Sequence, residues 1–125
     1  MKSRKYKDRD FRYIDLWYRR RGMVPLTPNI LPKVGVIVPG IAAGFLMQTD
    51  TVSAILEPFI SNPKADQKLR DAALYQIMRE LIVTAQNLGY RQLFGFSSSK
   101  QMTGRALELG FKFIENGVTV CKDIH

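Results

Sequence analysis

The first apolar pattern in the chain has the period of an α-helix. It covers Asp10–Arg21 and is followed by Gly22, a residue type that commonly ends helices. Three prolines then stand too close together for a helix or a central strand. We therefore predict an N-terminal helix with one apolar face, and a proline-rich loop that leads to Val34. The residues of the apolar face are Phe11, Ile14, Trp17 and Tyr18.

Three runs with the character of β-strands follow this loop. Proline, glycine and aspartate at their junctions favour tight turns, so the runs predict an antiparallel meander. Pro58 lies inside the third run, where a proline implies a bulge or a missing ladder hydrogen bond. The runs are Val34–Gly40, Ile41–Asp50 and Thr51–Pro63.

A long amphipathic helix is predicted next, from Asp66 or Gln67 to Leu88, with Gly89 as its C-terminal stop. Because this helix connects two predicted strands, we expect those strands to pair in parallel, with a right-handed crossover. The apolar face of the helix comprises Leu69, Leu74, Ile77, Met78, Leu81, Ile82, Ala85 and Leu88.

The rest of the chain predicts a strand, a short helix and a hairpin. Tyr90–Phe96 has strand character, and the three serines at 97–99 offer an N-cap for a helix through Leu109. Phe111–Ile124 predicts a C-terminal β-hairpin, with Asn116-Gly117 as a type I′ turn. We therefore expect a mixed α/β (α+β) domain with a mostly antiparallel, twisted sheet.

The composition fits a single small domain in a reducing compartment. The chain has 125 residues, 46% of them apolar, which is enough for one core and too little for two domains. The N-terminus lacks an apolar signal region, and no apolar run is long enough to cross a membrane, so we expect a cytoplasmic protein. Cys121 is the one cysteine and His125 the one histidine. We expect no metal site, and we expect Cys121 to be a small core residue.

Positive charge is concentrated at the start of the chain. Residues 1–22 hold nine Lys or Arg and three Asp, a net charge of +6 out of +8 for the whole chain. This segment is either a solvated helix face or a surface for a nucleic acid, an acidic partner or an anionic substrate. We predict weak, salt-dependent binding of polyanions there. Four aromatic residues of this segment could stack on bases, namely Tyr6, Tyr13, Trp17 and Tyr18, but three of them lie at helical spacing and are predicted to lie in the core or at its rim.

The order and lengths of the predicted elements from Val34 onward resemble the GCN5-related N-acetyltransferases. Four segments carry the resemblance: "ILEPFISNP", the helix ending "AQNLGY", the strand "RQLFGF", and "ALELGF". The opening "DLWYRRRG", the proline-rich loop and "GVIVPG" resemble small proteins of this type carried by bacteriophages. The resemblance implies one domain, with a basic helix and loop at 1–33 and the cofactor half at 34–125.

The resemblance also implies where acetyl-CoA binds. In the family, the pantetheine pairs with the exposed edge of the fourth strand, and the pyrophosphate rests on N–H groups at the start of the following helix. Counting back from Gly89 places the family's glycines at Ala72 and Leu74, whereas a second register reads Gln67-x-x-Arg70-x-Ala72. Neither register contains glycine, so we expect weak binding. The cofactor residues are predicted to be Phe59, Ile60, Ser61, Gln67, Lys68, Arg70, Asp71, Ala72, Ala73 and Leu74, although Lys68 and Arg70 also fit a solvated first helical turn.

Two catalytic residues are implied in the same way. Glu57 stands where some members of the family place the glutamate that deprotonates the amine, although the position also fits a solvent-facing strand residue next to a bulge at Pro58. The family's proton-donating tyrosine falls on Ala106. Ser98 or Ser99 matches the asparagine of the same motif, but either serine is also an ordinary N-cap.

Two functions therefore follow from the sequence. The first is an N-acetyltransferase that moves an acetyl group from acetyl-CoA to an amine. The second is an inactive module of the same fold that binds a protein partner, such as a structural protein of a phage particle in the host cytoplasm or the virion. The missing glycines and the missing tyrosine favour the second function, and the intact strand, loop and helix favour the first.

Overall fold

The computed structural model describes residues 1–23, 27–97, 99–115, 117 and 120–124. Its strands form one five-stranded sheet with the order β1-β2-β3-β4-β5. Neighbouring strands are antiparallel except β4 and β5, which are parallel, as predicted for the two strands that flank the long helix. The strands are β1 (Arg4–Lys5), β2 (Val34–Val38), β3 (Ala42–Met47), β4 (Ser53–Ser61) and β5 (Gln92–Gly95).

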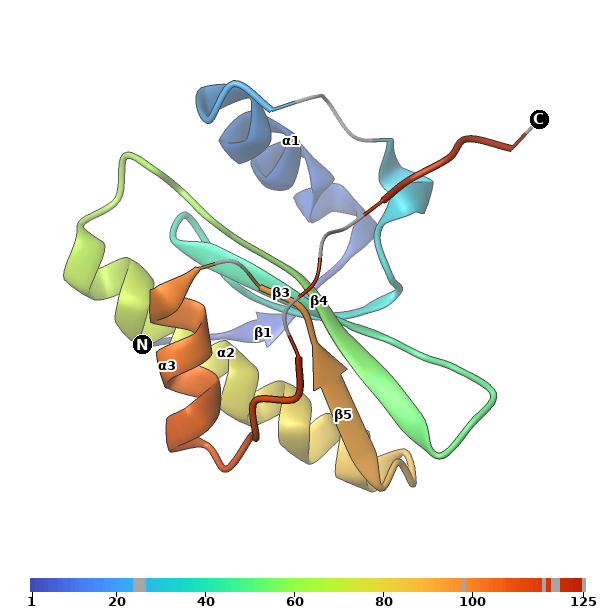
Figure 1. Cartoon of the computed structure of the whole chain (residues 1–125). Coiled ribbons are helices and arrows are strands. Elements are labelled where there is room, and N and C mark those ends of the chain that lie inside the picture. Colours follow the sequence, from blue (N-terminus) through green and yellow to red (C-terminus); the bar gives the residue numbers. More distant parts are fainter. Residues whose placement is uncertain (24–26, 98, 116, 118–119, 125) are drawn as a thin grey trace.

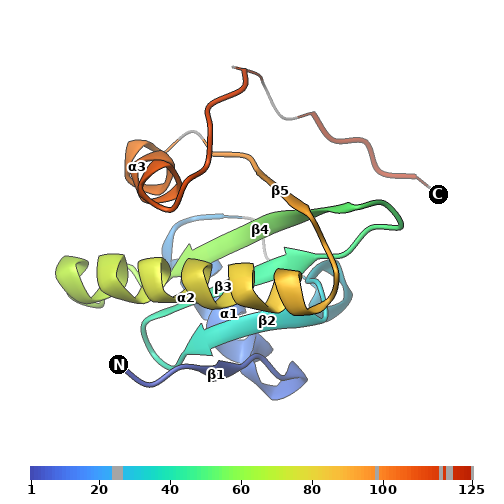
Figure 2. The same cartoon turned by 90° about the horizontal axis from the view of Figure 1, so that it is seen from below.

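Helices cover both faces of the sheet. α1 (Phe11–Arg20) lies on one face and α2 (Gln67–Asn87) on the other, while α3 (Lys100–Glu108) lies beside α2 beyond β5 (Figures 1 and 2). Two short 3-10 helices at Asp8–Asp10 and Pro28–Ile30 flank α1 and its loop. In the described ranges, each helix is too short or too polar to cross a membrane.

Each face of the sheet has its own apolar core. α1 contributes Ile14 and Trp17, which are buried against β2, β3 and β4, and the aromatic rings of Tyr6, Tyr13 and Tyr18 pack around them. This arrangement confirms the predicted apolar face of α1. On the other face, the buried residues of α2 are Ala73, Leu74, Ile77, Met78, Leu81 and Ala85.

Two ends of the predicted face of α2 are exposed instead of buried. Leu69 is 47% exposed and Leu88 is 50% exposed. A helix of this length spans about 30 Å, at about 1.5 Å per residue. Strands β2 and β3 beneath it have five and six residues and span only about 17 to 20 Å at about 3.3 Å per residue, so the helix ends extend past these two strands.

Strand β4 contains the irregularity that Pro58 predicts. Gly44 stands opposite Phe59 and Leu46 opposite Leu56, so β4 has one more residue than β3 between these two pairs. This is a β-bulge at Glu57-Pro58. It changes the direction of the strand just where β5 stops pairing with it.

Strand β1 and its ion pair were not predicted. Arg4 stands opposite Ile37 at the edge of the sheet, and its guanidinium binds the buried carboxylate of Asp10 through two hydrogen bonds of 2.7 and 2.6 Å. Because Lys7 N also donates to Asp10 at 2.8 Å, the carboxylate holds β1 against the turn that precedes α1.

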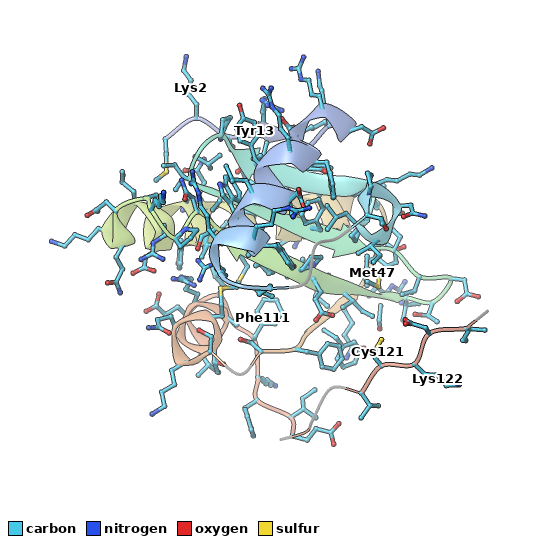
Figure 3. All side chains as sticks on the ribbon, turned by 90° about the horizontal axis from the view of Figure 1, so that it is seen from above. Lys2, Tyr13, Met47, Phe111, Cys121 and Lys122 are labelled. Atoms are coloured by element: carbon cyan, nitrogen blue, oxygen red, sulfur yellow. The ribbon has the colours of Figure 1, made fainter. Side chains whose placement is uncertain are left out.

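The predicted C-terminal hairpin does not appear in the described residues. Residues 111–115, 117 and 120–124 form no strand, and part of the predicted turn, Asn116, lies outside the described residues. A two-stranded hairpin is stable only when one face packs against the domain. Here the side chains of Phe113, Ile114 and Val120 are exposed. Cys121 is exposed on the same segment, so its prediction as a core residue is wrong (Figure 3).

Candidate functional site

Strand β4 is longer than the strand that pairs with it on its outer side. β5 pairs with the first part of β4, Ser53–Leu56. The remainder, Glu57–Ser61, has no strand on that side within the described ranges, and Figure 2 shows β5 leading away from it toward α3. We call Glu57–Ser61 the open edge of β4.

The ladder between β3 and β4 determines which backbone groups of the open edge face outward. Asn62 N donates to Ile41 O at 2.8 Å, and Ser61 stands opposite Ala42. In an antiparallel ladder, this makes Ser61 and Ala42 a non-hydrogen-bonded pair, so the Ser61 N–H and C=O point away from β3. By the same alternation, the backbone groups of Phe59 point outward and those of Ile60 point toward β3. An extended ligand that pairs with the open edge would therefore bond to Phe59 and Ser61.

The C-terminal end of α1 reaches the far end of this edge. Arg21 Nε and Nη2 donate to the Ser61 carbonyl oxygen at 3.3 and 3.0 Å, and Nη2 also donates to Ser61 Oγ at 2.8 Å. Arg20 Nη1 donates to Asn62 Oδ1 at 3.0 Å. Burial and the positive charge of Arg70 lower the pKa of Arg21. The end of the open edge therefore has a positive environment.

The start of α2 lies next to this positive region. Asp66 is its N-cap, and the Asp66 carboxylate accepts hydrogen bonds from Lys68 N and Leu69 N at 3.1 and 3.3 Å. These two N–H groups belong to the first turn, which helix geometry leaves unpaired. The side chains of Gln67 and Lys68 are exposed. The Asp66 carboxylate therefore already accepts hydrogen bonds from two of the N–H groups that the resemblance assigns to the pyrophosphate.

The two predicted registers of the phosphate loop differ in their positions on α2. Ala73 and Leu74 are buried against the sheet, while Ala72 is exposed. Because α2 begins at Gln67, all three residues lie inside the helix, where their N–H groups belong to the helical ladder. The register that begins at Gln67 lies at the helix start, beside the end of the open edge.

Arg70 lies in this second register, and its Nε is buried without a hydrogen-bond partner in the described part of the chain. The adjacent acid, Asp71, is bound by Arg105 of α3, with Nη2 and Oδ1 2.5 Å apart. This ion pair joins α3 to α2 and engages the carboxylate nearest to Arg70 in sequence.

Glu57 is at the beginning of the open edge, on the face covered by α1. Its neighbour Leu56 belongs to the core under α2, and the bulge at Glu57-Pro58 interrupts the alternation of the strand, so the direction of Glu57 follows from its neighbour on α1. Burial and, second, the charge of Glu57 raise the pKa of Tyr18 of α1, which indicates that the two side chains are near each other. Both side chains are half-buried. A carboxylate and a protonated phenol therefore lie together on the α1 side of the edge.

Ser99 is the N-cap of α3, where its Oγ accepts a hydrogen bond from Met102 N at 3.3 Å. This is the ordinary structural role that the sequence also predicted for it, while Ser98 lies outside the described residues. Ala106 packs against the core under α2 and carries no donor or acceptor on its side chain. Of the two predicted catalytic residues, Glu57 is at the open edge and Ser99 is at a helix cap.

Three residues at this site were not predicted as site residues: Tyr18, Arg21 and Asp66. In the sequence, each of these residues fits an ordinary structural role in its own helix. Tyr18 belongs to the apolar period of α1, Arg21 to its basic C-terminal end, and Asp66 to a helix start. The packing of α1 against the sheet brings Tyr18 and Arg21 to β4, whereas Asp66 follows β4 closely in the chain.

Solved structures from several organisms have the same fold. A mutant of a protein from Thermus thermophilus aligns with a TM-score of 0.73 at 11% identity, over 100% of this chain and 99% of the other. The ribosomal-protein-S18-alanine N-acetyltransferase from Escherichia coli aligns with a TM-score of 0.68 at 13% identity, over 91% and 79%. A predicted acetyltransferase from Clostridium acetobutylicum, solved with acetyl-CoA, aligns with a TM-score of 0.67 at 13% identity, over 96% and 95%.

No family model matches the sequence, and no curated protein is similar enough to match it. At 11–13% identity, the structures share a fold with this chain and little sequence. The chain therefore has the fold of the GCN5-related N-acetyltransferases, which confirms the fold class predicted from its sequence.

Proposed function

We propose that this protein transfers an acetyl group from acetyl-CoA to an amine, with the acetyl donor bound along the open edge of β4. The observation that carries the proposal is this edge, at which Phe59 and Ser61 direct their backbone groups outward beyond the last pair of β5. One neighbour of the same fold was solved with acetyl-CoA, which supports a donor of this kind. The fold alone does not specify the reaction, so the residues of the edge must support it.

The residues present fit the donor in part. The backbone of Phe59 and Ser61 offers donors and acceptors to the amides of a pantetheine arm. At the start of α2, Asp66 already bonds two of the N–H groups that would receive the diphosphate. We therefore expect weaker binding than a free helix start would give.

Glu57 is the proposed general base. When bound, acetyl-CoA supplies an activated thioester. Glu57 accepts a proton from the attacking amine, directly or through water, as the amine nitrogen bonds to the carbonyl carbon and the carbon–sulfur bond breaks. Ala106 has no proton to give to the departing thiolate, so solvent must supply it. Loss of a general acid lowers rates by about 10²- to 10⁴-fold, so we expect slow turnover.

Calorimetric titration with acetyl-CoA tests the binding step. We expect a dissociation constant between about 10 μM and 1 mM, which corresponds to about −7 to −4 kcal/mol. Absence of heat at millimolar acetyl-CoA would contradict the proposal.

A transfer assay on a panel of primary amines tests the role of Glu57. Glu57→Gln should lower kcat by about 10²- to 10⁴-fold while acetyl-CoA still binds. Glu108→Gln is the matched control, because it removes the same charge from an exposed position on α3. Equal rates for wild type and Glu57→Gln would exclude Glu57 as the base. The acceptor amine, the narrower resemblance to phage proteins and the cytoplasmic or virion location stay predictions.

A further inference from the structure

Two arginines approach the end of β4 from opposite faces of the sheet. Arg21 directly follows α1, which covers one face, and Arg70 lies near the start of α2, which covers the other (Figure 2). Burial and, second, the positive charge of Arg70 lower the pKa of Arg21. The two guanidinium groups are therefore close enough to repel each other. We call Arg21 and Arg70 the arginine pair.

Neither member of the arginine pair has a carboxylate partner within the described ranges. Arg21 bonds instead to the neutral carbonyl and hydroxyl of Ser61, and Arg70 Nε is buried without a partner. Two like charges close together, one of them partly buried at Arg70, are unfavourable unless an anion joins them. The ion pairs in the described ranges join Arg4 to Asp10, Arg19 to Asp15 and Arg105 to Asp71.

We propose that the arginine pair is an anion-binding site that holds the diphosphate of acetyl-CoA. This inference rests on the proposed function, since it names the side chains that hold one part of the donor. Each planar guanidinium can donate two parallel hydrogen bonds to phosphate oxygens, so two guanidinium groups suit a diphosphate. The side chains thereby take over the task of the N–H groups that Asp66 occupies at the start of α2.

The position of Arg21 implies an exchange of partners when the donor binds. Its guanidinium donates hydrogen bonds to the outward-facing carbonyl oxygen of Ser61, which is one of the acceptors that a ligand paired with the open edge needs. A pantetheine arm that pairs with Ser61 displaces Arg21 from this oxygen. The diphosphate next to it then offers the released guanidinium a charged acceptor, which forms a stronger hydrogen bond than a neutral one.

Inorganic pyrophosphate is the direct probe of this site, measured by calorimetric titration of the full chain. We expect Arg21→Gln and Arg70→Gln each to weaken pyrophosphate binding at least tenfold. Arg12→Gln is the matched control, because it removes the same charge from an exposed position on α1, and it should change the affinity less than twofold. Arg21→Lys, which keeps the charge without the fork, should fall between wild type and Arg21→Gln.

Several results would overturn the inference. One is that the wild-type protein does not bind pyrophosphate at millimolar concentration. Another is that the Arg21→Gln variant binds pyrophosphate as tightly as wild type. Equal losses in Arg21→Gln and Arg12→Gln would also overturn it, because they would show general charge attraction. Arg70 is partly buried, so circular dichroism must show that Arg70→Gln is folded. If it is not, the exposed Arg21 decides the question.

A second titration separates this inference from the proposed function. Acetyl-CoA carries the diphosphate and S-acetylpantetheine lacks it, so Arg21→Gln should weaken binding of acetyl-CoA and should not weaken binding of S-acetylpantetheine. If acetyl-CoA binds wild type and Arg21→Gln equally, the arginine site is wrong and the proposed function stands. If pyrophosphate binding depends on the arginine pair but acetyl-CoA does not bind, the anion site stands and the proposed function is wrong.

Discussion

The carboxylate of Asp66 lies 3.1 Å from the backbone nitrogen of Lys68 and accepts its hydrogen bond. It also accepts one from Leu69 N, so a negative charge of the chain itself sits at the positive end of α2. The cap stabilises the helix, and at the same time it competes with any phosphate for these N–H groups. If acetyl-CoA binds at this helix start, as proposed, the stability of α2 and the affinity for the donor are opposed at Asp66.

Removing the charge of Asp66 should raise the affinity for acetyl-CoA. Asp66→Asn keeps an N-cap of similar strength and removes the charge, so we expect about three- to tenfold tighter binding, about 0.7–1.4 kcal/mol. Asp66→Gly also releases both N–H groups, at a stability cost of only a few tenths of a kcal/mol, and should bind more tightly still. Calorimetric titration with acetyl-CoA measures both variants.

The control for this experiment is Asp123→Asn, which removes a charge from an exposed position on the C-terminal segment. It should leave the affinity for acetyl-CoA unchanged. Asp66 variants that bind acetyl-CoA no better than wild type would show that the cap and the donor do not compete.

The packing of α2 gives a prediction on stability. Leu81 is fully buried in the core beneath α2, whereas Val83 on the same helix is 53% exposed. Leu81→Asp places an unpaired charge in the core and should lower the free energy of unfolding by more than about 4 kcal/mol. Val83→Asp should change it by less than about 1 kcal/mol. Thermal melts followed by circular dichroism compare the two, and a Leu81→Asp protein that melts like wild type would contradict this placement of α2.

Much of the fold was predictable because its signals are local. The turn residues between the first three runs led to the meander, and Pro58 led to the bulge in β4. Gly89 and Gly110 have φ values of +92° and +93°, a conformation that glycine adopts easily, and each marks the end of a helix. These signals lie within a few residues of the structure they determine.

The candidate site was only partly predictable because its contacts join distant parts of the chain. Glu57 and Ser61 could be placed on one strand from the sequence. The contact between Arg21 and Ser61 joins residues 40 positions apart, and it depends on how α1 packs on the sheet. Strand β1 is likewise two charged residues long, so its pairing with β2 leaves no apolar pattern to detect.

The basic start of the chain should bind polyanions. Lys2, Lys5 and Lys7 are exposed and have no carboxylate partner among the described residues, and Figure 3 shows Lys2 pointing away from the ribbon. Serine at these three positions should lower the salt concentration that elutes the protein from heparin. The matched control changes Lys100, Lys112 and Lys122 to serine, with the same change in net charge at the other end of the chain. Equal elution of the two triple variants would show that the N-terminal segment is not the binding surface.

The ion pair between Arg4 and Asp10 makes stability depend on pH in the acid range. Hydrogen bonds from Arg4 lower the pKa of Asp10, against the opposing effect of burial and with help from Lys7 N. A carboxyl whose pKa is lower in the folded state stabilises the fold above its unfolded pKa, about 3.9, and this contribution disappears as the pH falls through the folded pKa.

Asp10→Asn should therefore lower the free energy of unfolding at pH 7 by about 1–3 kcal/mol, and the difference from wild type should shrink steadily below about pH 4. Urea titrations at pH 7, 4, 3 and 2 measure both proteins. Asp8→Asn is the control, because this exposed aspartate lies two residues away, and it should follow the wild-type profile. A wild-type protein that loses no more stability between pH 4 and 2 than Asp10→Asn does would show that the buried carboxylate is not held in its charged form, and that β1 is fixed to the turn before α1 by other contacts.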